Sequence, residues 1–217
     1  MEILRTANAG VLLKLDDVTI LLDGVCREVK PYLATPLHLR EALQKSWPDA
    51  VAFTHMHKDH YDPDYAVEFS KCTGGVIFGP EQLGRVTTTR ESTRIGNVTV
   101  KPVKSRHIGA AGKETEHYSY LVQGSKCVFF TGDASPSQWA GCTDLPKIDA
   151  LIVPYAYAIT SAGWRSARAL CDGTIVLVHM PEKNSDPDGL WDLVLSVAGN
   201  PNGATFWIPA LEEYIEI

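Results

Sequence analysis

Six consecutive residues, His55-Met56-His57-Lys58-Asp59-His60, include four side chains that commonly bind metal ions. They follow residues 49–54, a mostly apolar run that predicts a buried strand ending at a tight turn. The two histidines of the His-x-His pair can approach one cation together, which leaves Asp59 and His60 free to hold a second cation nearby. Imidazole and carboxylate ligands suit zinc, and also iron or manganese. The motif therefore predicts two divalent ions that share a bridging hydroxide.

Two such ions need more ligands than one turn can supply, and three further candidates follow later strand-like runs. They are His107 after residues 98–103, Asp133 after residues 127–130 and His179 after residues 175–178. Each lies near the carboxyl end of a predicted strand, where open α/β sheets place their ligands. Singly, such a histidine is more often a structural residue and a Gly-Asp pair is more often a turn. Together, and in this order after the first motif, the three are predicted to be ligands.

The elements that must position these residues are short strands mixed with helices. Strands are predicted at 11–15, 18–22, 50–54, 75–78, 92–95, 98–103, 118–123, 126–131, 151–153, 175–178, 204–208 and 213–216, and helices at 37–45, 63–72, 161–171 and 187–198. Asp62 followed by Pro63 is typical of a helix N-terminus, and Gly124-Ser125 indicates a hairpin. Each half of the chain has strands first and strand–helix alternation afterwards. This pattern predicts an α/β (α+β) fold in which helices cover a pair of stacked sheets.

Length and charge limit the classes of function. The chain has 217 residues without repeats or linkers, so we expect a single domain over residues 1–217. The net charge of −6 argues against a nucleic-acid surface, because such proteins usually carry a basic face. Two bound dications would still allow a small anionic substrate.

The sequence also indicates a cellular compartment. Residues 1–5 lead directly into strand-like sequence, without the basic start and apolar stretch of a secretory signal. No run approaches the roughly 20 apolar residues of a membrane helix. The five cysteines include no Cys-x-x-Cys pair, so we interpret them as reduced thiols and not as catalytic nucleophiles. These features predict a cytoplasmic protein that acts away from membranes.

Over essentially its full length the chain resembles the metallo-β-lactamase superfamily, the αββα sandwich hydrolases. The superfamily's His-x-His-x-Asp-His turn matches residues 55–60 without substitution, and its early strand ending in aspartate matches residues 21–24. The resemblance implies a four-layer αββα sandwich of two mixed β-sheets flanked by helices. It also implies the ligands: His55, His57 and His107 for one ion, Asp59, His60 and His179 for the other, and Asp133 shared between them.

One ligand position has two candidates, because His117 competes with His107 for the third histidine. We prefer His107, since His117 begins a predicted strand and its side chain would point to the other end of the sandwich. His117 could still approach a substrate if the loop at 108–116 folds back.

Several other residues are candidates for catalysis and substrate binding. Asp59, a ligand by resemblance, is also a candidate to orient the attacking water. Protonation of the leaving group needs a donor, and the candidates are His117, Tyr155 and Tyr157. Arg106 and Lys113 flank the loop after the third ligand and could bind an anionic group. Packing of the two tyrosines at a domain edge, and simple solvation of the two cations, remain open alternatives.

The chain differs from some branches of the superfamily, and these differences limit the reactions that we expect of it. Metallo-β-lactamases that hydrolyse antibiotics have a cysteine in place of Asp133 and lack the histidine at position 60, so antibiotic hydrolysis is not expected. The chain is most similar to the compact hydrolases of the superfamily, including the group that contains ascorbate-6-phosphate lactonase. We therefore expect a binuclear hydrolase, with zinc favoured over manganese or iron, that cleaves a small ester, lactone or phosphodiester. The alternatives are a nuclease or cyclic-nucleotide phosphodiesterase of this fold, and a non-hydrolytic redox or sensing relative.

Overall fold

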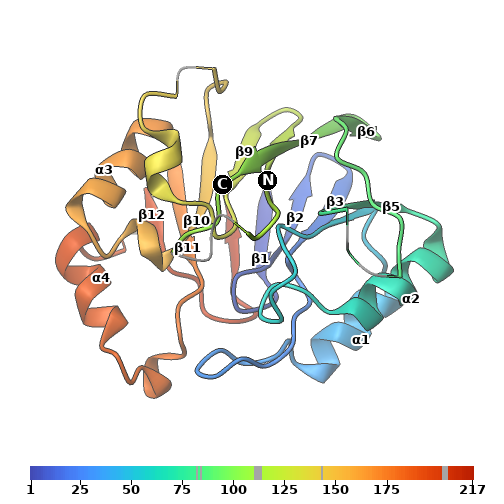
Figure 1. Ribbon diagram of the computed structural model, residues 1–217, viewed down its shortest axis with the longest axis horizontal. Helices are drawn as coiled ribbons and strands as arrows, with labels where there is room; N and C mark the ends of the chain where they lie inside the picture. The colour runs from blue at the N-terminus through green and yellow to red at the C-terminus, as the bar shows by residue number, and fades with distance from the viewer. Residues whose placement is uncertain (82, 84, 110–113, 143, 202–204) are drawn as a thin grey trace.

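Two β-sheets are stacked at the centre of the molecule, and helices cover the outer face of each sheet (Figure 1). The computed structural model describes residues 1–217 except 82, 84, 110–113, 143 and 202–204. Among these described residues, no helix is both long and apolar enough to cross a membrane. The arrangement confirms the predicted four-layer sandwich of two mixed sheets.

The first sheet has six strands in the order β13-β1-β2-β3-β4-β5. Their bounds are β1 Glu2–Arg5, β2 Val11–Leu15, β3 Val18–Leu22, β4 Ala50–Ala52, β5 Val76–Phe78 and β13 Tyr214–Glu216. Strands β13, β1, β2 and β3 pair antiparallel, whereas β3, β4 and β5 pair parallel. The carboxyl ends of β3 and β4 therefore lie at the same edge of this sheet.

The second sheet has seven strands in the order β12-β11-β10-β9-β8-β7-β6. Their bounds are β6 Thr93–Ile95, β7 Val98–Ser105, β8 His117–Gln123, β9 Cys127–Phe130, β10 Ala150–Pro154, β11 Thr174–Val178 and β12 Phe206–Trp207. Strands β6 to β9 pair antiparallel, and the predicted turn at Gly124-Ser125 joins β8 to β9. Strands β9 to β12 pair parallel. Consecutive apolar residues bury both faces of β10 and β11, as is usual for parallel strands covered on two sides.

In the described part of the chain, four helices form the outer layers: α1 Leu37–Lys45, α2 Pro63–Thr73, α3 Ser161–Leu170 and α4 Leu190–Ala198. Short 3-10 turns occur at η2 Pro136–Trp139, η3 Tyr155–Tyr157 and η4 Lys183–Ser185. The N-terminus of α2 follows the prediction, because the Asp62 carboxylate accepts from the backbone N–H groups of Asp64 and Tyr65, with Pro63 at the first helical position.

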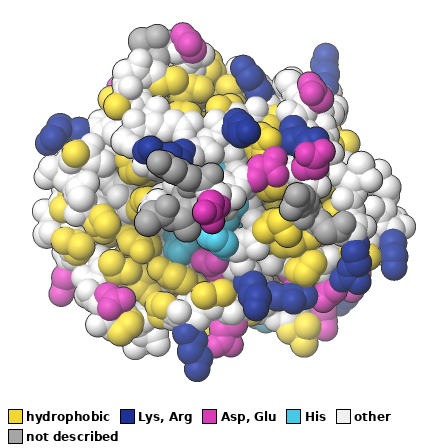
Figure 2. Space-filling model, viewed as in Figure 1, with side chains coloured by type: hydrophobic (Ala, Val, Ile, Leu, Met, Phe, Trp, Pro, Cys, Tyr) yellow, Lys and Arg dark blue, Asp and Glu magenta, His cyan; other side chains and the backbone are white. Residues whose placement is uncertain are grey.

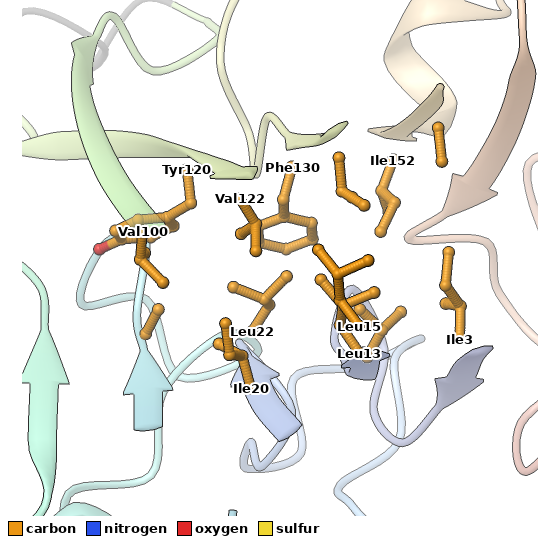
Figure 3. Close-up of a cluster of buried hydrophobic side chains, with 14 of the residues drawn as sticks. Ile3, Leu13, Leu15, Ile20, Leu22, Val100, Tyr120, Val122, Phe130 and Ile152 are labelled. Carbon is orange, nitrogen blue, oxygen red and sulfur yellow. The ribbon is translucent and has the colours of Figure 1, made fainter. Parts of the chain in front are cut away.

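Three apolar layers hold the sandwich together. The largest lies between the sheets, where Leu13, Ile20, Val122 and Phe130 point toward one another (Figure 3). A second packs α1 and α2 against the first sheet through side chains such as Leu43, Phe53 and Phe69. A third packs α3 and α4 against the second sheet through side chains such as Leu151, Ala167 and Val194. With both faces of each sheet filled by side chains, the strand ends are left to carry polar chemistry.

Candidate metal centre

All seven predicted ligands meet at one edge of the sandwich, although they come from four separate segments of the chain. Residues 55–60 form the turn after β4, whereas His107 follows β7, Asp133 follows β9 and His179 follows β11. The loops after β7 and β9 also touch directly, through a bridge between His107 and Ala134. The site is therefore shared between the two sheets.

The first group of candidate ligands consists of His55, His57 and His107, whose ligand atoms all lie within 4.8 Å of one another. Nε2 of His55 lies 2.9 Å from Nδ1 of His57. Nδ1 of His107 lies 2.6 Å from the carbonyl oxygen of Ile108, which leaves its Nε2 free to face the group. Three imidazoles in this arrangement are typical zinc ligands.

The second group consists of Asp59, His60 and His179, and its ligand atoms also lie within 4.8 Å of one another. Nε2 of His179 lies 3.2 Å from Oδ2 of Asp59, and Nε2 of His60 lies 3.8 Å from the same oxygen. His179 has a left-handed backbone with φ of +63°, a conformation that is uncommon for residues other than glycine. Strain of this kind often marks a functional position.

Asp133 lies between the two groups. Its Oδ2 atom is 3.8 Å from Nε2 of His107 in the first group, and 3.4 Å and 3.6 Å from Nε2 of His60 and of His179 in the second. The preceding Gly132 has a φ of +52°, and a Cβ atom there would lie 2.4 Å from a carbon of Thr54. Glycine at this position thus lets the Asp133 loop approach the turn after β4.

A buried carboxylate, Asp23 at the end of β3, orients histidines of both groups. It accepts from the backbone N–H of Thr54 at 2.7 Å and from the Thr54 hydroxyl at 2.6 Å. Nδ1 of His60 lies 2.9 Å from Asp23 Oδ2. Because the Thr54 hydroxyl gives its hydrogen to Asp23, it accepts from Nδ1 of His55 at 2.9 Å. Both histidines are thereby held with Nε2 toward the centre, as is typical of partners behind metal ligands.

A third set of possible ligand atoms, from Asp23, His55 and His60, also lies within 4.8 Å of one another. The hydrogen bonds of Asp23 explain this proximity without an ion, because both of its oxygens already accept from Thr54 and one of them also meets His60. We therefore regard Asp23 as a positioning residue.

The donor atoms around the centre fit divalent metal ions. Among the described residues, several buried polar atoms at the site have no hydrogen-bond partner: Nε2 of His60, His107 and His117, both ring nitrogens of His179, and Oδ1 of Asp133. Buried polar atoms without partners are costly, and metal coordination is one way to satisfy them together. An acidic oxygen between histidine nitrogens is a donor set that zinc, iron and manganese accept.

Protonation states at several ligands agree with this interpretation. His60 differs: burial would lower its pKa, but Asp133 and Asp23 hold it well above the ordinary value, so an ion bound there would displace a proton. Burial, reinforced by the neighbouring His60, holds the pKa of His55 well below its ordinary value. Burial and His107 lower the pKa of His57 in the same way. Burial alone would raise the pKa of Asp133, but His179 and His60 hold it well below the ordinary value. Neutral imidazoles and an ionised carboxylate are the forms that bind metal.

His117 lies in the site and does not point to the other end of the sandwich as the sequence predicted. Strand β8 runs antiparallel to β7, so its first residue pairs with Ser105 at the edge where β7 ends. The His117 ring centroid is 5.1 Å from that of His55, and its Nδ1 lies 2.7 Å from the Ser105 hydroxyl. Burial lowers its pKa to about 3. His117 thus stands behind the first group, whereas His107 completes it.

The two candidate tyrosines lie in different surroundings. The Tyr155 ring is half-buried, with its centroid 5.8 Å from that of His179 in the second group. Tyr157 is fully buried in the layer beneath α3, where its hydroxyl accepts from Trp139 Nε1 at 2.8 Å. This packing explains Tyr157 without a catalytic role, and Tyr155 remains the tyrosine candidate for a donor.

Two basic side chains, Arg106 and Lys113, are candidates to bind an anionic group of the substrate. Arg106 is exposed, and its guanidinium donates to the hydroxyls of Ser137 at 2.8 Å and Ser135 at 3.4 Å. It therefore lies along the loop after Asp133, and its role in substrate binding stays a prediction. Lys113 lies outside the described residues.

Three residues at the site were not predicted from the sequence. The Tyr32 ring meets the His179 ring edge-on, with centroids 4.4 Å apart. The Asn8 carbonyl accepts from the His179 backbone N–H at 3.0 Å, and the Asn8 amide lies 3.4 Å from Asp59. Buried Arg5 donates to the carbonyls of Asn8 and Met180. These contacts join distant segments, so no local sequence signal reveals them.

Comparison with known proteins places these features in a family. A family model described as "Beta-lactamase superfamily domain" matches residues 5–171. No curated protein matches the chain.

Solved structures share the fold at low sequence identity. A possible metal-dependent hydrolase from Veillonella parvula has a TM-score of 0.73 at 14% identity, and the match covers 100% of this chain and 99% of that one. An isothiocyanate hydrolase from Delia radicum gut bacteria has a TM-score of 0.69 at 17% identity, with 100% and 99% covered. The diiron β-hydroxylase CmlA from Streptomyces venezuelae has a TM-score of 0.66 at 14% identity, with 100% of this chain but 54% of CmlA covered. With the family model spanning most of its length, this chain belongs to the β-lactamase superfamily, and its sandwich is that of the metallo-β-lactamase fold.

Proposed function

We propose that this protein is a binuclear metal-dependent hydrolase that cleaves a small ester, lactone or phosphodiester. The observation that carries the proposal is the pair of ligand groups joined by Asp133, each with atoms within 4.8 Å of one another. Membership of the superfamily and the hydrolase relatives of the same fold support the reaction class.

The first group would hold one ion through His55, His57 and His107, and the second would hold the other through Asp59, His60 and His179. Asp133 is placed to serve both. Divalent ions bound there would lower the pKa of a coordinated water toward 7 and stabilise charge that develops on a substrate oxygen. Zinc suits this donor set best, with manganese and iron as alternatives.

The chain's own groups would orient the reactants and move protons. Asp23 fixes the direction of His55 and His60, as its contacts through Thr54 indicate. Asp59 can accept a hydrogen bond from the attacking water. The Tyr155 phenol, beside His179, is our candidate to protonate the leaving group. His117 is neutral near pH 7, because burial lowers its pKa to about 3, so it has no proton to give to the leaving group through an imidazolium form.

The substrate would be a small molecule and not a nucleic acid, since a net charge of −6 disfavours the binding of a polyanion. All five cysteines are free thiols in the structure, which is compatible with the cytoplasmic location that we propose.

The test combines metal analysis with turnover. Purified protein should contain two divalent ions per chain, and the loaded enzyme should hydrolyse members of a lactone and ester panel faster than bis-p-nitrophenyl phosphate. Turnover of the phosphodiester alone would favour a nuclease or cyclic-nucleotide phosphodiesterase. Protein without metal and without turnover of either substrate class would refute the proposal.

A second candidate function is oxidative chemistry at a diiron centre. It is favoured by one structural relative, the diiron β-hydroxylase CmlA, which shares this fold. Iron as the bound metal, together with oxygen consumption that depends on a reductant, would support this candidate over hydrolysis.

A further inference from the structure

A cavity of about 480 Å³ lies beside the metal centre, between η2, η3 and the first turn of α3. Its size falls within the range of small-molecule sites. Its apolar wall includes Ile108, Pro136, Ala156, Ile159 and Ala162.

Three residues of the cavity wall are close to residues of the metal centre. Ile108 directly follows the candidate ligand His107 and is bound to it through its carbonyl oxygen. Ala156 directly follows Tyr155, whose ring is close to His179. Ser135 begins the segment after Asp133, and its backbone N–H donates to the Arg106 carbonyl at 2.8 Å. The cavity wall therefore begins one residue from His107 and one residue from Tyr155.

The space-filling view shows which types of side chain surround the histidines (Figure 2). Histidine side chains lie at the base of a hollow, and hydrophobic side chains border them on the left of the view, the side of α3 and α4 in Figure 1 (Figure 2). Acidic and basic side chains are mixed with hydrophobic ones on the opposite side (Figure 2). The apolar surface thus begins next to the histidines.

The hydroxyl groups of the cavity wall are already bonded within the protein. The hydroxyls of Ser135 and Ser137 lie 3.0 Å apart and both accept from Arg106. The Thr160 hydroxyl accepts from the Gly163 backbone, and the Ser166 hydroxyl donates to the Pro136 carbonyl at 3.1 Å. These partners leave a ligand with mainly apolar contacts, and a charged group there would lose hydration without compensation.

From these observations we propose that the cavity binds an aliphatic chain of the substrate, so that the substrate class is an uncharged carboxylic ester or lactone with an alkyl or acyl chain. The inference rests on the hydrolase function proposed above. The reaction adds one water, breaks the acyl C–O bond, and yields a carboxylate, an alcohol and a proton. The carbonyl group would lie at the metal centre while the chain occupies the cavity.

The direct test is a series of p-nitrophenyl esters, from acetate through butyrate and hexanoate to octanoate. For the metal-loaded enzyme, kcat/KM should rise by about fourfold for each added methylene that enters the cavity. Acetate and hexanoate differ by four methylenes, so the total rise should approach about 250-fold when the whole chain enters the cavity. A flat profile would overturn the inference.

A matched pair of variants on α3 locates the effect. Ala162 and Ala169 are both exposed alanines of this helix, but Ala162 lines this cavity whereas Ala169 lines another one. Ala162→Phe should remove the preference for long chains. Ala169→Phe should behave like the wild type, and equal melting temperatures would show that both variants fold.

Calorimetric binding of octanamide separates this inference from the proposed function. If the wild type and Ala169→Phe bind octanamide but Ala162→Phe does not, the cavity assignment holds even when no ester is hydrolysed. If esters are hydrolysed but Ala162→Phe matches Ala169→Phe in chain preference and in octanamide binding, the hydrolase function stands and the cavity assignment is wrong.

Discussion

The two ligand groups share one edge of the sandwich but are stabilised in different ways. The first group consists only of histidines, and the buried side chain of His117 stands behind it with its hydrogen bond to Ser105. The second group contains a carboxylate, Asp59, and depends on loops that are distant in sequence. Its His179 is held by the Asn8 carbonyl and by the ring of Tyr32.

This difference indicates separate tasks. The all-imidazole group is closed from behind by strand residues, which suits a tightly held ion. The second group contains an acidic oxygen and is bordered by half-buried Tyr32 and Tyr155, so we expect substrate groups to approach on this side. We expect the second ion to be bound more weakly and to exchange faster than the first.

The largest effect should follow from removing a ligand of the first group. His107→Ala should weaken binding of the first ion far more than His117→Ala does, because only His107→Ala removes one of the three imidazoles of the first group. Competition with a chromogenic chelator measures both affinities. If His117→Ala loses more metal than His107→Ala, the two histidines have been assigned in the wrong order.

On the side of the second group, Tyr155→Phe should lower kcat by about 100-fold, the usual lower range for loss of a general acid. Metal content should not change, since the phenol is not among the ligands. Tyr157→Phe is the control: it removes the hydrogen bond with Trp139 and should cost about 1 kcal/mol of stability with little change in kcat. Equal kcat values for Tyr155→Phe and wild type would exclude Tyr155 as the donor.

Asp23→Ala should weaken metal binding in both groups, but by different amounts. Asp23 contacts His60 directly but reaches His55 only through Thr54. Loss of such a partner commonly reduces metal affinity by 10- to 100-fold, so we expect about 100-fold for the second ion and about 10-fold for the first. Asp16→Ala, which removes a carboxylate bound to Ser125 far from the site in sequence, is the control. Equal losses at both ions would contradict the unequal dependence on Asp23.

The smallest effect concerns thiol reactivity. Exposed Cys72 and Cys142 should react quickly with a disulfide reagent at pH 8, and buried Cys26, Cys127 and Cys171 slowly. Burial raises the pKa of Cys127 to about 11, so its thiolate fraction should rise about tenfold per pH unit below that value.

The same thiol labelling can be compared with and without bound metal. Cys26 belongs to the loop that carries Tyr32, and its backbone N–H donates to the Thr35 hydroxyl at 3.0 Å. Chelation of the metal should therefore speed the labelling of Cys26 severalfold and leave Cys127 unchanged. Similar acceleration of both thiols would indicate general unfolding and not loosening of the second group.

Much of the fold could be predicted because local patterns determine it. The strands at 11–15 and 18–22 and the helix at 37–45 have their predicted bounds. The last helix begins at Leu190 and not at 187, because the Asp186 carboxylate accepts from the N–H groups of Leu190 and Trp191 and so sets its start. The predicted strand at 204–208 is observed as Phe206–Trp207, with residue 204 outside the described part.

The site was less predictable wherever contacts join distant segments. The motif at 55–60 can be recognised from its residue types and spacing, and the predicted strand ends identify His107, Asp133 and His179. The position of His117 depends on the antiparallel pairing of β7 with β8, which spacing alone does not reveal. The roles of Asn8 and Tyr32 depend on how loops at opposite ends of the chain meet. Asp23 did carry a signal, since it ends a strand in the resembled pattern, but its links to His55 and His60 needed the structure.

The central claim is that seven side chains hold two metal ions through a shared Asp133, and the most direct test is the metal content per chain of the wild type and of Asp133→Ala, measured by plasma mass spectrometry. The account predicts two ions in the wild type and at most one in Asp133→Ala, with loss of turnover. Unchanged metal content and unchanged activity in Asp133→Ala would contradict it.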